Sequence, residues 1–417
     1  MSATDRERAL ELDAADPLRS FRDRFYRPDS DLAYLDGNSL GMLPLRTRER
    51  LRAFADDEWG GELVGGWSHW QTLPFEAGDR IGEIVGAAAG QVVVADSISV
   101  NLYKLAVAVL EAQPGRKVIV TDAGNFPSDR YVLQGAAERR KGQLRLVPTD
   151  PVEGVTEANV HTYLADDVAL VSFSHVDYRS ATIANVRELT EQAHRAGALV
   201  LWNLAHSAGA VPVDLDESGA DLAVGCTYKY LNAGPGAPGF LYVRQDLQHR
   251  LASPIQGWWS AADPFDMDAP YRPAEGIGRW LTGSPPVYGL IAAHESAGVM
   301  LEAGVGPLRA KSLALVEYLV ELADAWLSPL GFTLASTRDA ERRGGHVVLA
   351  HDDAYRIGRA AAAAGVIGDV RPPNLLRLAP VPLSTSFVDV WQGMTRLRDL
   401  VASGAHLALP SERPRVT

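Results

Sequence analysis

The chain has 417 residues, 47% of them apolar and 22% charged, which is typical of a soluble globular protein with a sizeable core. Its net charge of −12 argues against nucleic-acid binding, because no basic stripe is available to neutralise phosphates. A single cysteine, Cys226, excludes a disulfide framework and a thiolate zinc site, and no apolar run approaches the roughly 20 residues that a membrane span needs.

The N-terminus is charged and lacks the apolar core of a secretion signal, so we expect a cytoplasmic protein that does not associate with membranes. Four short, β-branched runs then follow, with helix-patterned stretches at 128–140 and 186–196 between them. The runs are Lys117–Thr121, Gln143–Val147, Val168–Ser172 and Ala198–Trp202. This alternation predicts an α/β protein with a mostly parallel central sheet and helices on both faces. Ligands in such sheets bind beyond the carboxyl ends of the strands.

The pattern changes after Pro285-Pro286. Helical periodicity covers 287–301, 308–327 and 387–401, and a strand-like run at 346–350 precedes an alanine-rich helix through 360–364. We therefore predict a large α/β domain at 66–285 and a smaller α+β domain at 286–417, with an N-terminal segment at 1–65 that packs with the small domain. The tail from 403 onward is expected to be loose, because Pro410 and Pro414 oppose a helix.

One lysine stands out by its surroundings. Lys229 follows the apolar run Asp221–Gly225 and precedes a rigid loop, Gly234-Pro-Gly-Ala-Pro-Gly239. An amine held at a strand end and partly desolvated has a lowered pKa, which suits a Schiff-base nucleophile. Taken alone, an exposed loop lysine is the simpler interpretation.

Polar loops fall where the neighbouring strands end. They are Asn125–Asp129, Ser174–Tyr178 and Asn203–His206, and a further segment, Ser97–Asn101, precedes a helix whose positive end could hold a phosphate. Each loop alone fits a helix cap or a turn. Together with Lys229 at one sheet edge, they predict a binding site.

These segments resemble the kynureninase family, pyridoxal-phosphate (PLP) enzymes with the aspartate aminotransferase fold. The resemblance is collinear and spans nearly the whole chain. Its matching pieces are Tyr34-Leu-Asp-Gly-Asn-Ser-Leu-Gly41, Asp96-Ser-Ile-Ser-Val-Asn-Leu102, Asn125-Phe-Pro-Ser-Asp129, Ser174-His-Val, 202–214, Thr227-Tyr-Lys-Tyr-Leu-Asn232, Gly257-Trp258, Ser284-Pro-Pro, and Val366-Ile-Gly-Asp369 followed by Leu376-Arg377.

The resemblance implies a role for each matching residue. Lys229 would form the internal aldimine with PLP and later act as the base at Cα of an amino-acid substrate, through an external aldimine and a Cα carbanion, with Tyr228 beside it. Phe126 would stack on the ring. The phosphate would be held by Ile98, Ser99, Tyr228, Trp258 and Ser284, and the rest of the cofactor would be lined by Asp129, Ser174, Asn203 and His206.

Three residues are implied for the substrate. Arg377 would clamp its carboxylate with a bidentate fork, while Ser39 and Trp67 would border it. A surface ion pair remains an alternative for Arg377, and core packing remains one for Trp67. The family also implies a homodimer with sites near the subunit boundary.

Several positions depart from the family pattern. Asn203 stands where the family has an aspartate bonded to the pyridine nitrogen, and a neutral amide can only hydrogen-bond there, which weakens the electron sink. Asp129 compensates only if its loop reaches the same ring. Substrate-side departures are Trp259-Ser-Ala261 for Phe-Gly-His, Asp177-Tyr-Arg-Ser-Ala181 for Asn-Tyr-basic-Thr-Gly, and Ser384 for a tyrosine. The cofactor site is thus expected to be retained and the substrate pocket changed, with random drift as the alternative.

The function implied by the resemblance is hydrolysis of L-kynurenine to anthranilate and alanine. Two alternatives stay open for a diverged member of secondary metabolism: β-elimination from a cysteine conjugate, and decarboxylation coupled to oxidative deamination. A PLP-binding protein without turnover is a third class, which intact Lys229 disfavours. A serine hydrolase using Ser207 is disfavoured because position 205 is Ala where the motif needs Gly.

Overall fold

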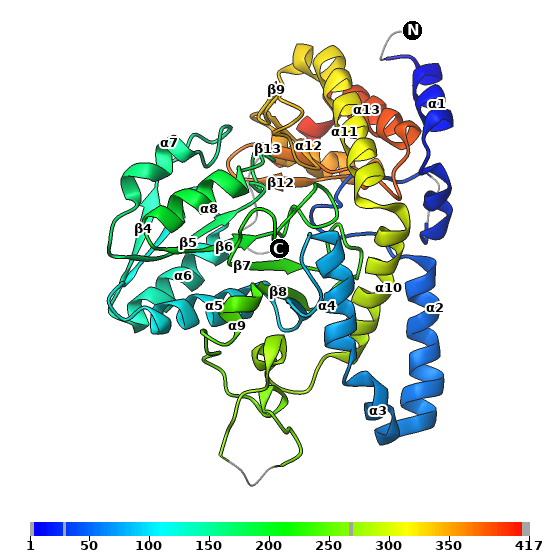
Figure 1. The fold of residues 1–417 in the computed structure, drawn as a ribbon. Helices are drawn as coiled ribbons and strands as arrows, with labels where there is room; N and C mark the ends of the chain where they lie inside the picture. The colour runs from blue at the N-terminus through cyan, green and yellow to red at the C-terminus, as the bar shows by residue number, and fades with distance from the viewer. Residues whose placement is uncertain (1–3, 28–30, 267–269, 411–417) are drawn as a thin grey trace.

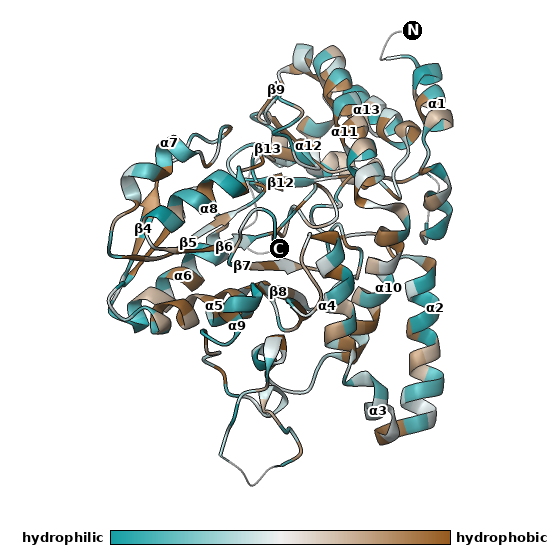
Figure 2. Ribbon diagram, viewed as in Figure 1, coloured by the Kyte–Doolittle hydropathy of each residue, from teal (hydrophilic) through white to brown (hydrophobic). Residues whose placement is uncertain are grey.

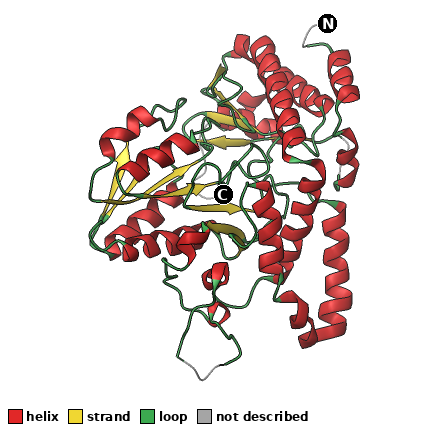
Figure 3. Cartoon of the chain, viewed as in Figure 1, coloured by secondary structure: helices red, strands yellow, loops and turns green. Residues whose placement is uncertain are grey.

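The computed structural model describes residues 4–27, 31–266 and 270–410. Its centre is a seven-stranded sheet in the order β2-β8-β7-β6-β5-β3-β4, with helices on both sides (Figures 1 and 3). All neighbouring pairs from β7 to β4 are parallel, and β8 runs antiparallel to both of its neighbours. The strands are β2 (Val92–Val94), β3 (Val118–Asp122), β4 (Gln143–Val147), β5 (Val168–Ser174), β6 (Leu199–Asn203), β7 (Leu222–Cys226) and β8 (Gly239–Val243). The predicted α/β class with a mostly parallel sheet is confirmed.

Apart from the edge strand β4, the sheet is buried on both faces, as its continuous apolar strands predict. In β3, Val118 and Val120 join one apolar core while Ile119 between them joins another, because successive side chains point to opposite faces. The first core includes α4 (Leu73–Ile84), α8 (Val186–Arg195) and α10 (Val287–Ala303), and the second includes α5 (Ile98–Ala112) and α6 (Pro127–Arg139). The remaining helices before α10 are α1 (Arg6–Ala15), α2 (Leu45–Ala53), α3 (Trp67–Trp70), α7 (Glu157–Val160) and α9 (Gln245–Gln248). Most residues of α2 are hydrophilic, as the teal of its ribbon shows (Figure 2).

A second, antiparallel sheet in the order β12-β13-β10-β9 forms above the first (Figure 1). Its strands are β9 (Thr333–Leu334), β10 (Val347–Ala350), β12 (Asp369–Arg371) and β13 (Leu375–Leu378), packed with α11 (Val305–Leu322), α12 (Ala354–Ala363) and α13 (Phe387–Ala402). The N-terminal segment joins this part, since β1 (Ala33–Tyr34) pairs in parallel with β11 (Val366–Ile367). The smaller α+β unit of the predicted fold class is thereby confirmed.

The domain boundaries stay a prediction, and the packing of helix α10 is relevant to the one placed at residue 286. This helix follows residue 286, yet it buries Leu290 and Ile291 in the core of the large sheet. Beyond residue 403 a short 3-10 helix, Ala405–Ala408, buries His406, and residues 411–417 of the expected loose tail lie outside the described part. Among the described helices, none combines the length and apolar character that crossing a bilayer requires.

Candidate active site

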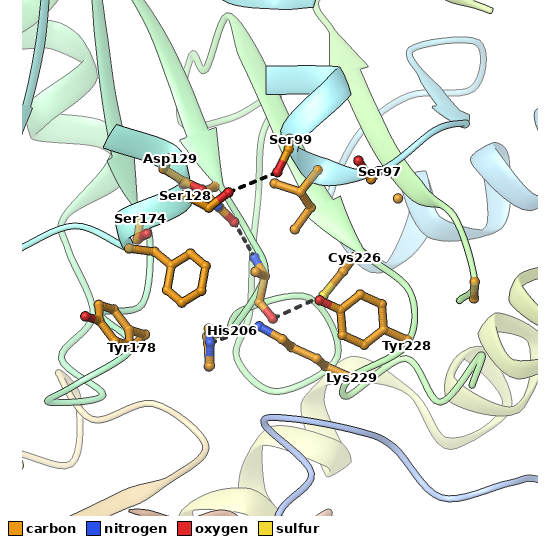
Figure 4. Close-up of a pocket in the computed structure, with 16 residues that line it drawn as sticks. Ser97, Ser99, Ser128, Asp129, Ser174, Tyr178, His206, Cys226, Tyr228 and Lys229 are labelled. Carbon is orange, nitrogen blue, oxygen red and sulfur yellow. Dashed lines mark hydrogen bonds between the residues drawn. The ribbon is translucent and has the colours of Figure 1, made fainter. Parts of the chain in front are cut away.

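Three neighbouring strands deliver polar residues to one edge of the large sheet. Ser174 ends β5 and lies in register with Asn203, which ends β6, and Cys226 ends β7 beside them. The helices α5 and α6 begin at the same edge. Together these ends line a cavity of about 190 Å³ (Figure 4), so the predicted convergence of the strand-end loops is found.

Lys229 enters this cavity from the loop after β7. The carbonyl of Tyr228 accepts a hydrogen bond from Gly41 N at 2.8 Å, and the carbonyl of Lys229 accepts one from Asn232 N at 2.9 Å. A Cβ atom on Gly41 would lie 2.3 Å from the Lys229 carbonyl oxygen, so only glycine permits this approach. The N-terminal segment therefore fixes the backbone that carries the lysine.

The environment of the amine keeps it reactive. Lys229 Nζ lies 3.1 Å from His206 Nε2. Burial lowers the pKa of Lys229, with Arg377 and Arg371 lowering it further and Cys226 and Asp129 opposing. Burial and the charge of Lys229 also hold the pKa of His206 well below its usual range. A neutral imidazole nitrogen can accept a hydrogen bond from an N–H of the neutral amine, which leaves the amine's electron pair available.

The opposite wall of the cavity is the start of α5. Ser97 caps this helix by accepting a hydrogen bond from Val100 N at 3.4 Å, and Ser99 Oγ lies 3.1 Å from Ser128 Oγ at the start of α6. A Cβ atom on Gly239 would lie 3.1 Å from Ile98 N, so the glycine leaves this amide uncovered. Free N–H groups and hydroxyls at a helix N-terminus suit an anion such as phosphate.

Between these two walls lies a buried amide–carboxylate pair. Asn203 Nδ2 donates to Asp129 Oδ2 at 2.6 Å, and Asn203 Oδ1 accepts from Ala205 N at 2.8 Å. Burial raises the pKa of Asp129 to about 6, although the hydrogen bond from Asn203 and the charge of Lys229 act in the opposite direction.

Aromatic rings close the cavity. Phe126 is 42% exposed and meets Tyr178 edge-on, with ring centroids 5.2 Å apart. Burial raises the pKa of Tyr228 to about 12, so its hydroxyl stays protonated at neutral pH. The sequence did not single out Ser128, Tyr178 or Cys226, which also line the cavity. Each stands inside or beside a matching segment, so taking whole loops rather than single positions would have found them.

The remaining predicted residues lie outside this cavity. Arg377 is buried and binds Asp369 through Nε at 2.6 Å and Nη2 at 2.5 Å, while Nη1 donates to the Tyr178 carbonyl at 2.7 Å. Burial raises the pKa of Asp369, but the hydrogen bonds and charge of Arg377 outweigh this and lower it overall. Ser39 Oγ donates to the same carboxylate at 3.3 Å. Arg377 is thus in an ion pair, but a buried one and not at the surface.

Trp67, Trp258 and Ser284 are also apart from the cavity. Trp67 is partly buried and packs edge-on against Trp70 and at a tilt against Trp259, with centroids 5.5 and 5.6 Å away. Trp258 is 40% exposed and Ser284 is exposed. None of the three residues lines the cavity within this one chain.

Comparison with known proteins points to the same family that the segments around the site resemble. Residues 308–397 match the family model described as the kynureninase C-terminal domain. A kynureninase of Burkholderia pseudomallei (strain K96243) is 40% identical over 408 residues, 96% of each chain, and one of Pseudomonas fluorescens is 38% identical over 95% of this chain and 96% of its own. The chain belongs to the kynureninase family.

Solved structures show the same fold at low identity to this kynureninase-family chain. A cysteine desulfurase from Thermococcus onnurineus NA1 has a TM-score of 0.78 at 18% identity, covering 94% of this chain and 98% of its own. The cysteine desulfurase CsdA of Escherichia coli has a TM-score of 0.80 at 14% identity, covering 93% and 98%. Both place the chain in the PLP fold that the sequence predicts.

The enzyme uses PLP, and the cavity residues fit that cofactor. Lys229 offers an amine to an aldehyde, the start of α5 offers N–H groups to a phosphate, and the uncovered space at Gly239 lets the phosphate approach. Bound PLP supplies an electrophilic aldehyde and a ring that draws electrons from the α-carbon of an amino acid.

Proposed function

We propose that this enzyme hydrolyses the Cβ–Cγ bond of L-kynurenine, in which one water is consumed and anthranilate and alanine are released. The observation that carries the proposal is the Lys229 amine beside neutral His206 in a cavity whose walls match the family segments. The named kynureninases, which align over almost the whole chain at about 40% identity, support the same activity.

Two side chains would act directly on the substrate. Lys229 Nζ, with its lowered pKa, would take the proton from Cα. Arg377 would bind the carboxylate through the Nη1–Nη2 edge, with the hydrogens that remain after Asp369 takes the Nε–Nη2 edge and the Tyr178 carbonyl takes one hydrogen of Nη1. Ser39, bonded to Asp369, would border this end. Trp67, which packs with Trp259, would contact the substrate only if the aromatic side chain of the substrate extends toward that wall.

A second candidate is β-elimination from a cysteine conjugate, which shares removal of the Cα proton and then expels a group from Cβ. Asn203 and the segment Trp259-Ser260-Ala261, which lacks the family's imidazole, favour it. Ser260, next to the position where the family has the imidazole, is buried, and its hydroxyl lies 3.1 Å from Tyr271 OH. Decarboxylation coupled to oxidative deamination would need molecular oxygen as oxidant and ranks behind both.

Product analysis separates the candidates. Purified enzyme loaded with PLP is incubated with L-kynurenine and, separately, with S-substituted cysteines, and anthranilate fluorescence and pyruvate are measured. Anthranilate that forms with the wild type and not with Lys229→Ala supports kynurenine hydrolysis. Pyruvate without anthranilate would refute kynurenine hydrolysis and support the C–S lyase activity. If neither product forms, both candidate activities are refuted.

We also propose that the enzyme is a homodimer in which Trp258 and Ser284 reach the phosphate of the other subunit. Both residues are exposed, and Trp258 stands on the long loop between α9 and α10 that projects from the molecule (Figure 1). A cytoplasmic location and a role in secondary metabolism are parts of the proposal that depend on the family and the departures alone.

Subunit mixing tests the shared site. Lys229→Ala lacks the amine and Trp258→Ala lacks the indole, so neither homodimer should bind PLP normally. In a mixed dimer, one of the two sites would combine Lys229 from the Trp258→Ala chain with Trp258 from the Lys229→Ala chain. Cofactor binding would therefore return at one of the two sites of each mixed dimer. If mixing restores nothing while both variants form dimers, Trp258 does not act across the subunit boundary.

A further inference from the structure

The side chain of Asn203 has a fixed orientation. Its Oδ1 accepts a hydrogen bond from Ala205 N at 2.8 Å. A backbone N–H can only donate, so the amide oxygen must face Ala205 and the amide nitrogen must face the other way. There Nδ2 donates to Asp129 Oδ2 at 2.6 Å, and a carboxylate can only accept. Two independent partners therefore exclude the flipped amide.

This orientation leaves one donor for a ligand. The Nδ2 group carries two hydrogens, and Asp129 takes one of them. Asn203 lines the cavity although it is only 5% exposed, so the second hydrogen has the cavity as its available direction. The amide oxygen is turned toward Ala205 N, whose hydrogen occupies one of its two lone pairs.

The position of the ring nitrogen follows from the chemistry of PLP. The aldehyde carbon must reach Lys229, and the phosphate suits the start of α5. In the pyridine ring the nitrogen lies para to the aldehyde carbon, so it points away from Lys229 toward the third polar part of the cavity. That part consists of Asn203 and Asp129.

We propose that Asn203 donates a hydrogen bond to an unprotonated pyridine nitrogen, so that this enzyme holds PLP with a neutral ring. A protonated nitrogen would direct its N–H at another N–H, with donor facing donor. The inference rests on the proposed function for PLP binding, and it assigns the chain a cofactor state that an aspartate at this position would reverse.

Asp129 is then a positioning residue. It is 2% exposed and its Oδ2 accepts from the amide nitrogen, so it holds the amide against Ala205. The consequence for catalysis is a weaker electron sink, because a neutral ring accepts the electron pair from Cα less readily than a charged one.

The test is the ¹⁵N chemical shift of the ring nitrogen in enzyme reconstituted with PLP labelled at that atom, recorded at pH 7 and 8. We expect the shift of an unprotonated pyridine in the wild type. Asn203→Asp should move it to the pyridinium range. Asp129→Asn, which keeps an oxygen acceptor for the amide, should leave the wild-type shift unchanged.

Each other outcome overturns the inference. A pyridinium shift in the wild type contradicts the neutral ring at once. If that pyridinium shift is then lost in Asp129→Asn, Asp129 is the group that keeps the ring nitrogen protonated. If Asn203→Asp retains no cofactor, the other two spectra still decide. Failure of the wild type to bind labelled PLP would instead refute the proposed function, and that outcome is visible as the absence of any bound signal.

Discussion

The two groups of predicted site residues differ in where the single chain places them. Lys229, His206, Asn203 and Ser99 share one cavity at the edge of the large sheet. By contrast, Trp258, like Ser284 and Trp67, lies outside it. The cofactor end of the site is therefore built by the topology of one chain, whereas the rest depends on loops and, in our proposal, on a second subunit.

A third location lies between these extremes. Arg377 is fully buried, and its charge is already met by Asp369, with Arg371 bound to the same carboxylate at 2.7 Å. Such a cluster is costly to assemble and more costly to leave half-complete. It sets the position of one guanidinium edge before any substrate arrives. The contrast between cavity, cluster and exposed loop can be tested residue by residue.

The largest effect is expected from Lys229→Ala. Without the amine, PLP has no covalent attachment and the Cα proton has no base, so turnover should fall by about 10²–10⁴-fold. Borohydride reduction followed by peptide mapping measures the adduct. Lys117→Ala, which removes an exposed lysine at the amino end of β3, should retain it. An adduct that persists in Lys229→Ala would place the cofactor lysine elsewhere.

The sequence predicted the strands and their convergent ends, but it did not predict side-chain partners or helix ends. The difference lies in the interactions that form each feature. Apolar runs such as 168–172 predict buried parallel strands, and their carboxyl ends then converge by topology. This is why Ser174 and Asn203 were found at one edge. The pairing of Arg377 with Asp369 joins neighbouring antiparallel strands across a short turn, and periodicity alone does not reveal such a side-chain partner. The start of α11 at Val305 and its π-helical end also escaped the helical pattern, since helix ends depend on local packing.

Arg377→Ala should be the most destabilising change at the cluster. It leaves the Asp369 carboxylate without its bidentate partner, and we expect a loss of about 3–5 kcal/mol in the free energy of unfolding, measured with urea. The double variant with Asp369→Ala should lose less than the sum of the two single variants. Additive losses would show that the two side chains do not act as a unit.

Asp129→Asn should change how stability depends on pH. The pKa of Asp129 is raised to about 6, so the folded protein binds more protons than the unfolded chain between pH 4 and 6, and this group lowers stability as pH rises through that window. The variant should therefore gain stability relative to the wild type, on the order of 3 kcal/mol at pH 7 and little at pH 4.

Urea unfolding of the cofactor-free proteins at several pH values measures this difference. Asp352→Asn, at an exposed position in the small domain, is the control and should show no such trend. A constant difference between wild type and Asp129→Asn from pH 4 to pH 7 would contradict a raised pKa. The same result would weaken the contrast between a desolvated cavity and the solvated surface.

The smallest effects are expected from changing two serines at helix N-termini. Ser99 lies in the first turn of α5 at the cavity, and Ser386 caps α13 far along the chain in a capping box with Asp389. Ser99→Ala removes a hydroxyl that can bond a phosphate, so the Kd for PLP should rise about tenfold with little change in unfolding. Ser386→Ala should cost about 1 kcal/mol of stability and leave the Kd unchanged. If both variants bind PLP with the same Kd, the anion end of the cavity does not lie at the start of α5.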